Sequence, residues 1–87
     1  MELTEKFEAA VAKSKTLTKR PSNEELLELY ALFKQATEGD VTAERPGGFD
    51  FKAIAKYDAW EEKKGITKDD AINNYIALVD RLHQDYA

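Results

Sequence analysis

The sequence predicts an all-α fold of four helices, and three observations carry that prediction. Apolar residues recur at spacings of three and four in four segments, which places them on one face of a helix. Capping residues and glycines, which are start and stop signals of helices, separate these segments. No segment alternates apolar and polar residues with a period of two over a useful length. Because the chain has 87 residues, no internal repeat and no break in composition, residues 1–87 are expected to form a single domain.

The first expected helix runs from about Thr4 to Ser14, with Thr4 as its N-cap. Its apolar face consists of Phe7, Ala10 and Val11, and Leu3 is a further candidate for it. A short connection over residues 15–21 leads to the second helix.

The second helix has the clearest start signal. Ser22 followed by Glu25 matches a capping box, in which each side chain bonds a free amide at the start of the helix. Gly39 is expected to end the helix, since glycine readily adopts the left-handed conformation common at helix C-termini. The expected apolar stripe consists of Leu26, Leu29, Phe33 and Ala36. The residues expected on the opposite face are Glu24, Glu28 and Gln35.

A loop of about ten residues, 39–48, precedes the third expected helix. Asp50 is expected to cap this helix, which covers residues 51–64 and ends at Gly65. Thr67 and Asp70 then form a second start signal that resembles a capping box. The last helix is the most regular, with an apolar face made of Ile72, Tyr75, Ile76, Val79, Leu82 and Tyr86.

Composition limits the classes of function. The chain is 43% apolar and 34% charged, which is typical of a soluble globular protein. A net charge of −4 argues against a nucleic-acid partner, but not against a small anionic ligand, whose binding depends on local charge. The absence of cysteine excludes disulfides and thiolate metal sites. The start, MELTEKFEAAVAK, has no apolar run, and no segment approaches roughly 20 apolar residues, so a cytoplasmic location is expected.

Two lines of side chains are candidates for a binding site. In the second helix, Tyr30 and Lys34 are four residues apart on one border of the apolar stripe. In the third, Lys52 and Lys56 are also four apart, and the acidic residues of that helix point elsewhere. Such groups are suited to a ligand that is both apolar and anionic. The alternatives are that Tyr30 is a boundary core residue along which Lys34 extends, and that the other two lysines form a solvated edge.

Motifs that carry chemistry are missing from the sequence. Gly47-Gly48 fits neither a P-loop nor a dinucleotide-binding fingerprint. His83 is the only histidine, and no nucleophile motif accompanies it. We therefore expect a protein that is not an enzyme and has no metal site and no cofactor. Two alternatives stay open: a helical interaction module whose apolar groove takes a partner helix, and an enzyme, for which no nucleophile or base is positioned.

Two stretches carry several motifs in a fixed order, LYALFKQATEGDVTAERPG at residues 29–47 and DFKAIAKYDAW at residues 50–60. The order is a tyrosine, aromatic-Lys-Gln-Ala-Thr, Gly-Asp, Arg-Pro-Gly, and a Lys-x-x-x-Lys helix that ends in Asp-Ala-Trp. Together with the later DDAINNYIALV, they make the chain strongly resemble the acyl-CoA-binding protein family over essentially its whole length. The resemblance implies an antiparallel four-helix bundle.

The resemblance also implies a function. Members of this family bind medium- to very long-chain acyl-CoA thioesters in a pocket between helices. By this likeness the chain is expected to be a monomeric intracellular acyl-CoA carrier and pool former, without catalysis, in lipid transport and fatty acid metabolism. Its expected partner is long-chain acyl-CoA, with transient contact with membranes or acyl-CoA-using enzymes and no nucleic acid.

The family's pattern assigns roles to the four residues of the two candidate lines and to Phe33 of the apolar stripe. By resemblance, Tyr30 and Lys34 engage the nucleotide and its 3′-phosphate, and Phe33 contacts the adenine. Lys56 adds a phosphate contact, and Lys52 lies near the pantetheine or acyl part.

Two further contacts come from the resemblance alone. Tyr75 is expected to close over the nucleotide from the last helix, and Lys15 to reach the phosphates from the end of the first. Four positions depart from the family's pattern. They are Phe33 where tyrosine is common, Tyr57 where tryptophan is usual, Ile54 where lysine is frequent, and Val11 where alanine is frequent. The first change removes a hydroxyl, the second alters packing, the third removes a positive charge, and the fourth adds bulk near where acyl chains run in the family.

Overall fold

The structure is a computed structural model that describes residues 2–86, and it holds four helices within that range. They are α1 (Leu3–Ser14), α2 (Asn23–Glu38), α3 (Phe51–Glu61) and α4 (Lys68–Tyr86). None of the described residues belongs to a β-strand. The all-α prediction is confirmed.

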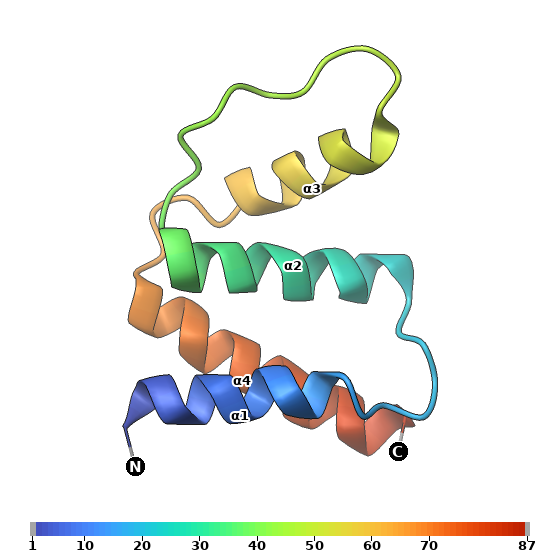
Figure 1. The fold of residues 1–87 in the computed structure, drawn as a ribbon, viewed down its shortest axis with the longest axis vertical. Coiled ribbons are helices and arrows are strands. Elements are labelled where there is room, and N and C mark those ends of the chain that lie inside the picture. Colours follow the sequence, from blue (N-terminus) through green and yellow to red (C-terminus); the bar gives the residue numbers. More distant parts are fainter. Residues whose placement is uncertain (1, 87) are drawn as a thin grey trace.

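The helices lie side by side in a flat stack that measures 39 × 28 × 15 Å along its principal axes. In the stack α3 packs on α2, α2 packs on α4, and α4 packs on α1 (Figure 1). Figure 1 also shows that α1 and α4 run in one direction and that α2 and α3 run in the other. The α1/α4 pair is therefore antiparallel to the α2/α3 pair, and the predicted antiparallel four-helix bundle is confirmed.

The long loop between α2 and α3 follows from this topology. Because α2 and α3 are neighbours that run in the same direction, the chain must return along the whole of α2, about 24 Å for its 16 residues. Three side chains of α3, Tyr57 among them, bind the returning loop. Asp58 accepts hydrogen bonds of 2.8 and 3.0 Å from the Arg45 guanidinium, and Trp60 Nε1 donates to the Gly39 carbonyl over 2.9 Å.

The buried core lies between α1, α2 and α4. Its members are Phe7, Ala10, Leu32, Ala36, Ala71, Ile72, Tyr75, Leu78, Val79 and Leu82. More than half of them come from α4, in agreement with the regular apolar face predicted there. Helix α3 has no fully buried residue and, among the described helices, packs on α2 alone. It is therefore the helix that the core holds least.

Local signals placed most helix ends correctly. Glu25 N–H donates to Ser22 Oγ over 3.1 Å and Ser22 N–H donates to Glu25 Oε1 over 2.9 Å, so the predicted capping box is confirmed. Gly39 ends α2 with a φ of 81°. Asp50 caps α3 by accepting a hydrogen bond from the Ala53 amide over 3.2 Å.

Two predicted ends were wrong. Helix α1 begins at Leu3 with Glu2 as N-cap, so Thr4 lies inside the helix and caps nothing. Helix α3 ends at Glu61 rather than about Lys64. The backbone there tightens, because the amides of residues 63 and 64 bond carbonyls three rather than four residues back.

The faces of α2 also differ from the prediction. Gln35, expected on the outer face, is only 1% exposed, whereas Phe33, expected in the central stripe, is 37% exposed. The buried residues of α2 are Ala31, Leu32, Gln35 and Ala36. The reason is that α2 lies between α3 and α4 and is covered from two sides, which a single apolar stripe does not describe.

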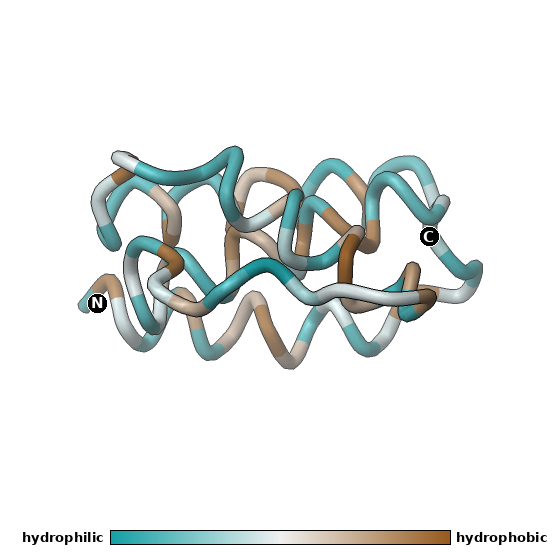
Figure 2. Tube along the Cα trace, turned by 90° about the horizontal axis from the view of Figure 1, so that it is seen from above, coloured by the Kyte–Doolittle hydropathy of each residue, from teal (hydrophilic) through white to brown (hydrophobic). Residues whose placement is uncertain are grey.

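Hydropathy along the trace agrees with these burials. Figure 2 shows hydrophobic positions recurring among hydrophilic ones along the helices, as amphipathic helices require. The long loop is teal and white over its middle and becomes brown where it enters α3 (Figure 2). Among residues 2–86, no helix combines the length and the apolar character needed to cross a membrane.

Candidate ligand-binding site

The two predicted lines of side chains face each other across α2 and α3. The Nζ atom of Lys56 lies 5.4 Å from the centre of the Tyr30 ring, and Nζ of Lys34 lies 5.1 Å from the Trp60 ring. Both are cation–π distances. Because α2 and α3 are parallel neighbours, residues four apart on each helix meet in register. The structure thus joins the two lines into one surface.

A hollow of about 440 Å³ opens between these helices, and we call it the α2/α3 pocket. Its lining residues are Arg20, Asn23, Leu26, Leu27, Tyr30, Phe51, Lys52, Ala55 and Lys56. The lining includes leucine, alanine and aromatic side chains together with three cations, and it contains no carboxylate. Such a pocket suits an apolar group that ends in negative charge.

A second hollow, of about 530 Å³, lies where the α1–α2 connection meets α2 and α4, and we call it the aromatic pocket. Its lining residues are Ser14, Leu17, Thr18, Lys19, Arg20, Pro21, Leu26, Leu29, Tyr30, Phe33 and Tyr75. Arg20, Leu26 and Tyr30 line both hollows, so the two pockets adjoin. Three aromatic rings and two cations are available here for a flat anionic group.

Tyr75 and Phe33 belong to one aromatic cluster with Phe7. The ring centres of Tyr75 and Phe7 lie 5.2 Å apart, and those of Tyr75 and Phe33 lie 6.4 Å apart. Tyr75 is only 4% exposed and its hydroxyl lies 3.4 Å from Ser14 Oγ, so its role in the core comes first. Phe33 also lines a third hollow, of about 440 Å³, together with Val11. Its ring therefore separates two hollows.

Lys34 and Lys15 lie beside the pockets rather than among their lining residues. Lys34 forms an ion pair with Glu38, whose hydrogen bond raises the pKa of the Lys34 ammonium. Lys15 is exposed at the C-cap of α1, directly after Ser14 of the aromatic pocket. The structure therefore gathers five of the seven predicted residues around the two pockets and places the other two at their edge.

Lys19 and Arg20 were missed by the sequence reasoning. Both are exposed, and both line the aromatic pocket. The available signal was a pair of adjacent cations just before the helix that carries Tyr30. Because a connection has no helical periodicity, its side chains could not be assigned to a face.

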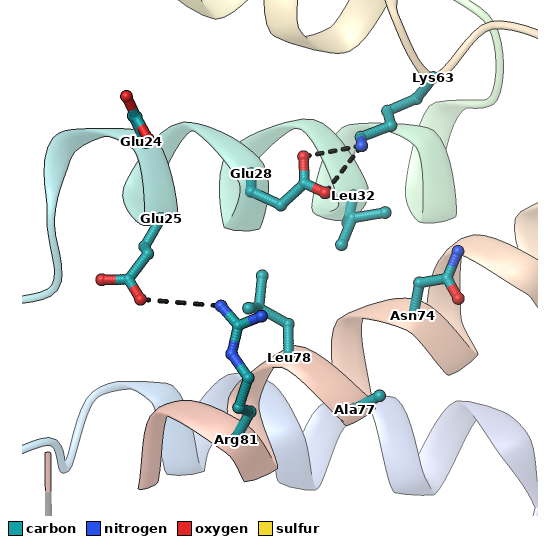
Figure 3. Close-up of a pocket in the computed structure, with 9 residues that line it drawn as sticks. All are labelled: Glu24, Glu25, Glu28, Leu32, Lys63, Asn74, Ala77, Leu78 and Arg81. Atoms are coloured by element: carbon teal, nitrogen blue, oxygen red, sulfur yellow. Dashed lines mark hydrogen bonds and ion pairs between the residues drawn. The ribbon is translucent and has the colours of Figure 1, made fainter. Parts of the chain in front are cut away.

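A further hollow, of about 580 Å³, lies between α2 and α4 and contains none of the predicted residues (Figure 3). Figure 3 shows two ion pairs across it. Lys63 Nζ lies 2.7 Å from a Glu28 oxygen, and an Arg81 nitrogen lies 3.7 Å from Glu25. Its cations are already paired with acids, so the α2/α3 and aromatic pockets are the better candidates for an anionic ligand.

The fold and the site define a class of small four-helix proteins in which two adjoining pockets combine apolar, aromatic and cationic side chains. Residues 4–79 match the family model described as Acyl CoA binding protein. The chain is 56% identical over 84 residues to Acyl-CoA-binding protein homolog 1 of Caenorhabditis elegans, which covers 97% of this chain and 98% of that one. It is 48% identical over 85 residues to the Acyl-CoA-binding protein homolog of Drosophila melanogaster, covering 98% and 99%. The crystal structure of Oryza sativa Acyl-CoA-Binding Protein 2 matches with a TM-score of 0.92 at 45% identity, covering 97% and 93%. The chain belongs to the acyl-CoA-binding protein family.

Proposed function

We propose that this protein binds medium- to long-chain acyl-CoA thioesters and acts as an intracellular acyl-CoA carrier and pool former. The observation that carries the proposal is the junction of the two pockets at Tyr30. One amphiphilic molecule can fill both, with its tail in one and its nucleotide in the other. Family membership and the names of the relatives support the same ligand.

In this proposal the acyl tail occupies the α2/α3 pocket, against Leu26, Leu27 and Ala55. Burying about 14 methylenes at roughly 0.8 kcal/mol each supplies on the order of 11 kcal/mol, an upper bound before ordering costs. The tail therefore provides most of the gross binding energy. Lys52 lies beside it, near the pantetheine or acyl part.

The nucleotide occupies the aromatic pocket. Phe33 stacks on the adenine, Tyr30 and Lys34 engage the nucleotide and its 3′-phosphate, and Tyr75 closes the pocket from α4. The phosphates draw on the surrounding ammonium and guanidinium groups as compact point charges and planar donors. The groups proposed for them are Lys15, Lys19, Arg20 and Lys56.

The protein makes no chemical change to the ligand in this proposal and needs no metal and no cofactor. His83 supports that view, because Nε2 of its ring lies 2.8 Å from the Lys13 carbonyl and 3.1 Å from Thr16 Oγ1. The ring thus joins the ends of α4 and α1, and His83 is not among the lining residues of either pocket. We further propose that residues 1–87 work as one acyl-CoA-binding domain, as a cytoplasmic monomer that meets membranes or acyl-CoA-using enzymes transiently.

Calorimetric titration with palmitoyl-CoA, palmitate and free coenzyme A tests the proposal. Palmitoyl-CoA is expected to bind far more tightly than either part alone, because only the whole molecule fills both pockets. Equal affinity for palmitate would exclude a headgroup site. A thiol reagent added to the palmitoyl-CoA mixture should report no released coenzyme A, and steady release would show hydrolysis.

Alanine variants test the site itself. Tyr30→Ala and Lys56→Ala are expected to weaken palmitoyl-CoA binding while the helical circular dichroism stays unchanged. Lys64→Ala is the matched control, because Lys64 is exposed and lies outside both pockets. If Tyr30→Ala or Lys56→Ala unfolds the protein instead, that residue belongs to the core and its assignment is wrong.

A further inference from the structure

Two phenylalanines are exposed at the start of α3. Phe49 is 91% exposed and Phe51 is 70% exposed, and their ring centres lie 6.4 Å apart in an edge-on arrangement. Phe33 is the remaining large hydrophobic side chain of residues 2–86 that is exposed, and it lines two hollows. Phe49 is not a lining residue of the pockets described above. We call Phe49 and Phe51 the phenylalanine pair.

A tight turn holds the phenylalanine pair in place. The Phe51 amide donates to the Phe49 carbonyl over 2.9 Å, and the intervening Asp50 binds the Ala53 amide as the cap of α3. Gly48 precedes the pair with a φ of 72°, a conformation that favours glycine. Phe49 and Phe51 thus lie where the long loop ends and α3 begins.

The phenylalanine pair adjoins the proposed tail site. Phe51 lines the α2/α3 pocket, together with the cations Arg20, Lys52 and Lys56. The nearest acid along the chain is Asp50, whose carboxylate binds the Ala53 amide. An apolar pair beside a cationic rim complements a lipid surface, in which phosphate headgroups overlie acyl chains.

We propose that the phenylalanine pair is a docking surface that enters the headgroup–acyl boundary of a lipid bilayer. This inference rests on the proposed function, since docking would hold the α2/α3 pocket against the membrane from which an acyl-CoA tail leaves. Phenylalanine is among the residues whose side chains enter that boundary from the apolar face of interfacial helices. Because two rings bury little apolar area, attachment is weak and reversible, as a carrier that leaves the membrane with its ligand requires.

A bilayer fits this surface better than a protein partner does. A specific protein interface buries at least roughly 1,000 Å² with good complementarity. Here two rings project from a loop whose glycines, Gly47 and Gly48, have open space around them. Two exposed rings cannot supply that area. A fluid bilayer needs no complementary surface, so each ring can insert into it separately.

The test compares Phe49→Ser with Phe49→Leu in a vesicle flotation assay, using phosphatidylcholine vesicles with and without phosphatidylserine. Because Phe49 lies outside the pockets, both variants are expected to bind palmitoyl-CoA in solution as the parent does. Phe49→Ser should lower the fraction bound to vesicles by about tenfold, whereas Phe49→Leu should retain most of it. Equal flotation of the parent and Phe49→Ser would overturn the proposal.

A second readout is the transfer of palmitoyl-CoA from vesicles to the protein. The rate at which palmitoyl-CoA is extracted from vesicles should fall about tenfold in Phe49→Ser while its affinity in solution is unchanged. If Phe49→Ser received palmitoyl-CoA more slowly only when an acyl-CoA-using enzyme supplied it, the partner would be a protein. That result would overturn the proposal of a bilayer. If the parent protein did not bind palmitoyl-CoA in solution, the proposed function itself would be wrong. Failure of the docking proposal and failure of the proposed function are therefore distinguishable.

Depth of entry provides the most direct evidence. Trp60 is the only tryptophan of the chain and is half-buried at the far end of α3. The quenching of its emission in the parent protein therefore serves as the baseline. Phe49→Trp is expected to add emission that brominated phosphatidylcholine quenches. Quenching no greater than that of the parent would show that position 49 stays in water.

Discussion

Gln35 shows how one buried amide can hold three segments together. Its Nε2 atom donates to the Ile66 carbonyl over 2.7 Å and to Asp40 Oδ1 over 2.8 Å. The end of α2, the long loop and the α3–α4 connection therefore meet at a single side chain. The buried amide nitrogen thus has two acceptors, and Asp40 Oδ1 also accepts a hydrogen bond of 2.9 Å from the Gly65 amide.

Replacing Gln35 by leucine should lower the free energy of unfolding by about 1–3 kcal/mol, because the two hydrogen bonds donated by its buried amide are lost. Urea denaturation measures the change. Gln84→Leu is the matched control at an exposed position and should shift stability by less than about 0.5 kcal/mol. Equal effects of the two substitutions would show that the buried amide contributes nothing specific.

Asp40 links stability to pH. A hydrogen bond from the Gly65 amide, followed by one from Gln35, lowers the pKa of the Asp40 carboxyl. A lowered pKa in the folded state means that the stabilisation is present above the unfolded value of about 3.9 and is lost as pH falls through the folded pKa. Unfolding free energies from about pH 6 down to about pH 2 should therefore decrease less steeply in Asp40→Asn than in the parent. Parallel pH profiles would exclude this linkage.

At the scale of elements, capping separates a true helix start from an apparent one. Ser22 bonds the amide of Glu25 at the start of α2, whereas Thr4 lies within α1 and makes no cap. Both residues were predicted as N-caps from the sequence, because serine and threonine are common at that position. Only the geometry distinguishes them.

Ser22→Ala is accordingly expected to cost about 1 kcal/mol of stability, since an amide at the start of α2 loses its acceptor. Thr4→Ala should cost less than about 0.5 kcal/mol. Thermal denaturation followed by circular dichroism compares the two variants. A Thr4→Ala variant as destabilised as Ser22→Ala would contradict the cap assignment.

At the scale of the whole molecule, α3 stands apart from the core. It has no fully buried residue, and among the described helices it contacts α2 alone. Its attachment depends on contacts of the half-buried Trp60 and on the ion pair of Asp58 with Arg45. The α2/α3 pocket leaves part of its interface with α2 unfilled. A ligand that fills that pocket bridges the helix to the rest of the fold.

Hydrogen exchange should therefore be fastest in α3 among the four helices, because few buried contacts oppose its opening. Palmitoyl-CoA is expected to slow exchange in α3 more than in α4, since the tail is proposed to bind between α2 and α3. Mass spectrometry of peptides from the exchanged protein measures both effects. Uniform slowing over all four helices would place the ligand elsewhere or show only global stabilisation.

The four helices and most of their caps were predictable because both depend on residues close in the sequence. The capping box of Ser22 and Glu25 and the stop at Gly39 are examples. The two candidate lines were also predictable, because residues four apart on a helix are neighbours. That they face each other was not, since it depends on the packing of α2 against α3. The ligand roles of these residues stay predictions.

By itself the sequence determined the four helices and, through ordered motifs, the family. Tertiary structure alone decided that Gln35 is buried and Phe33 exposed, that Lys19 and Arg20 join the aromatic pocket, and that Phe49 stands free beside the α2/α3 pocket. The physical reason is the distance along the sequence over which each interaction acts. Periodicity and capping act within a few residues, whereas the burial of a side chain depends on which distant helix covers it.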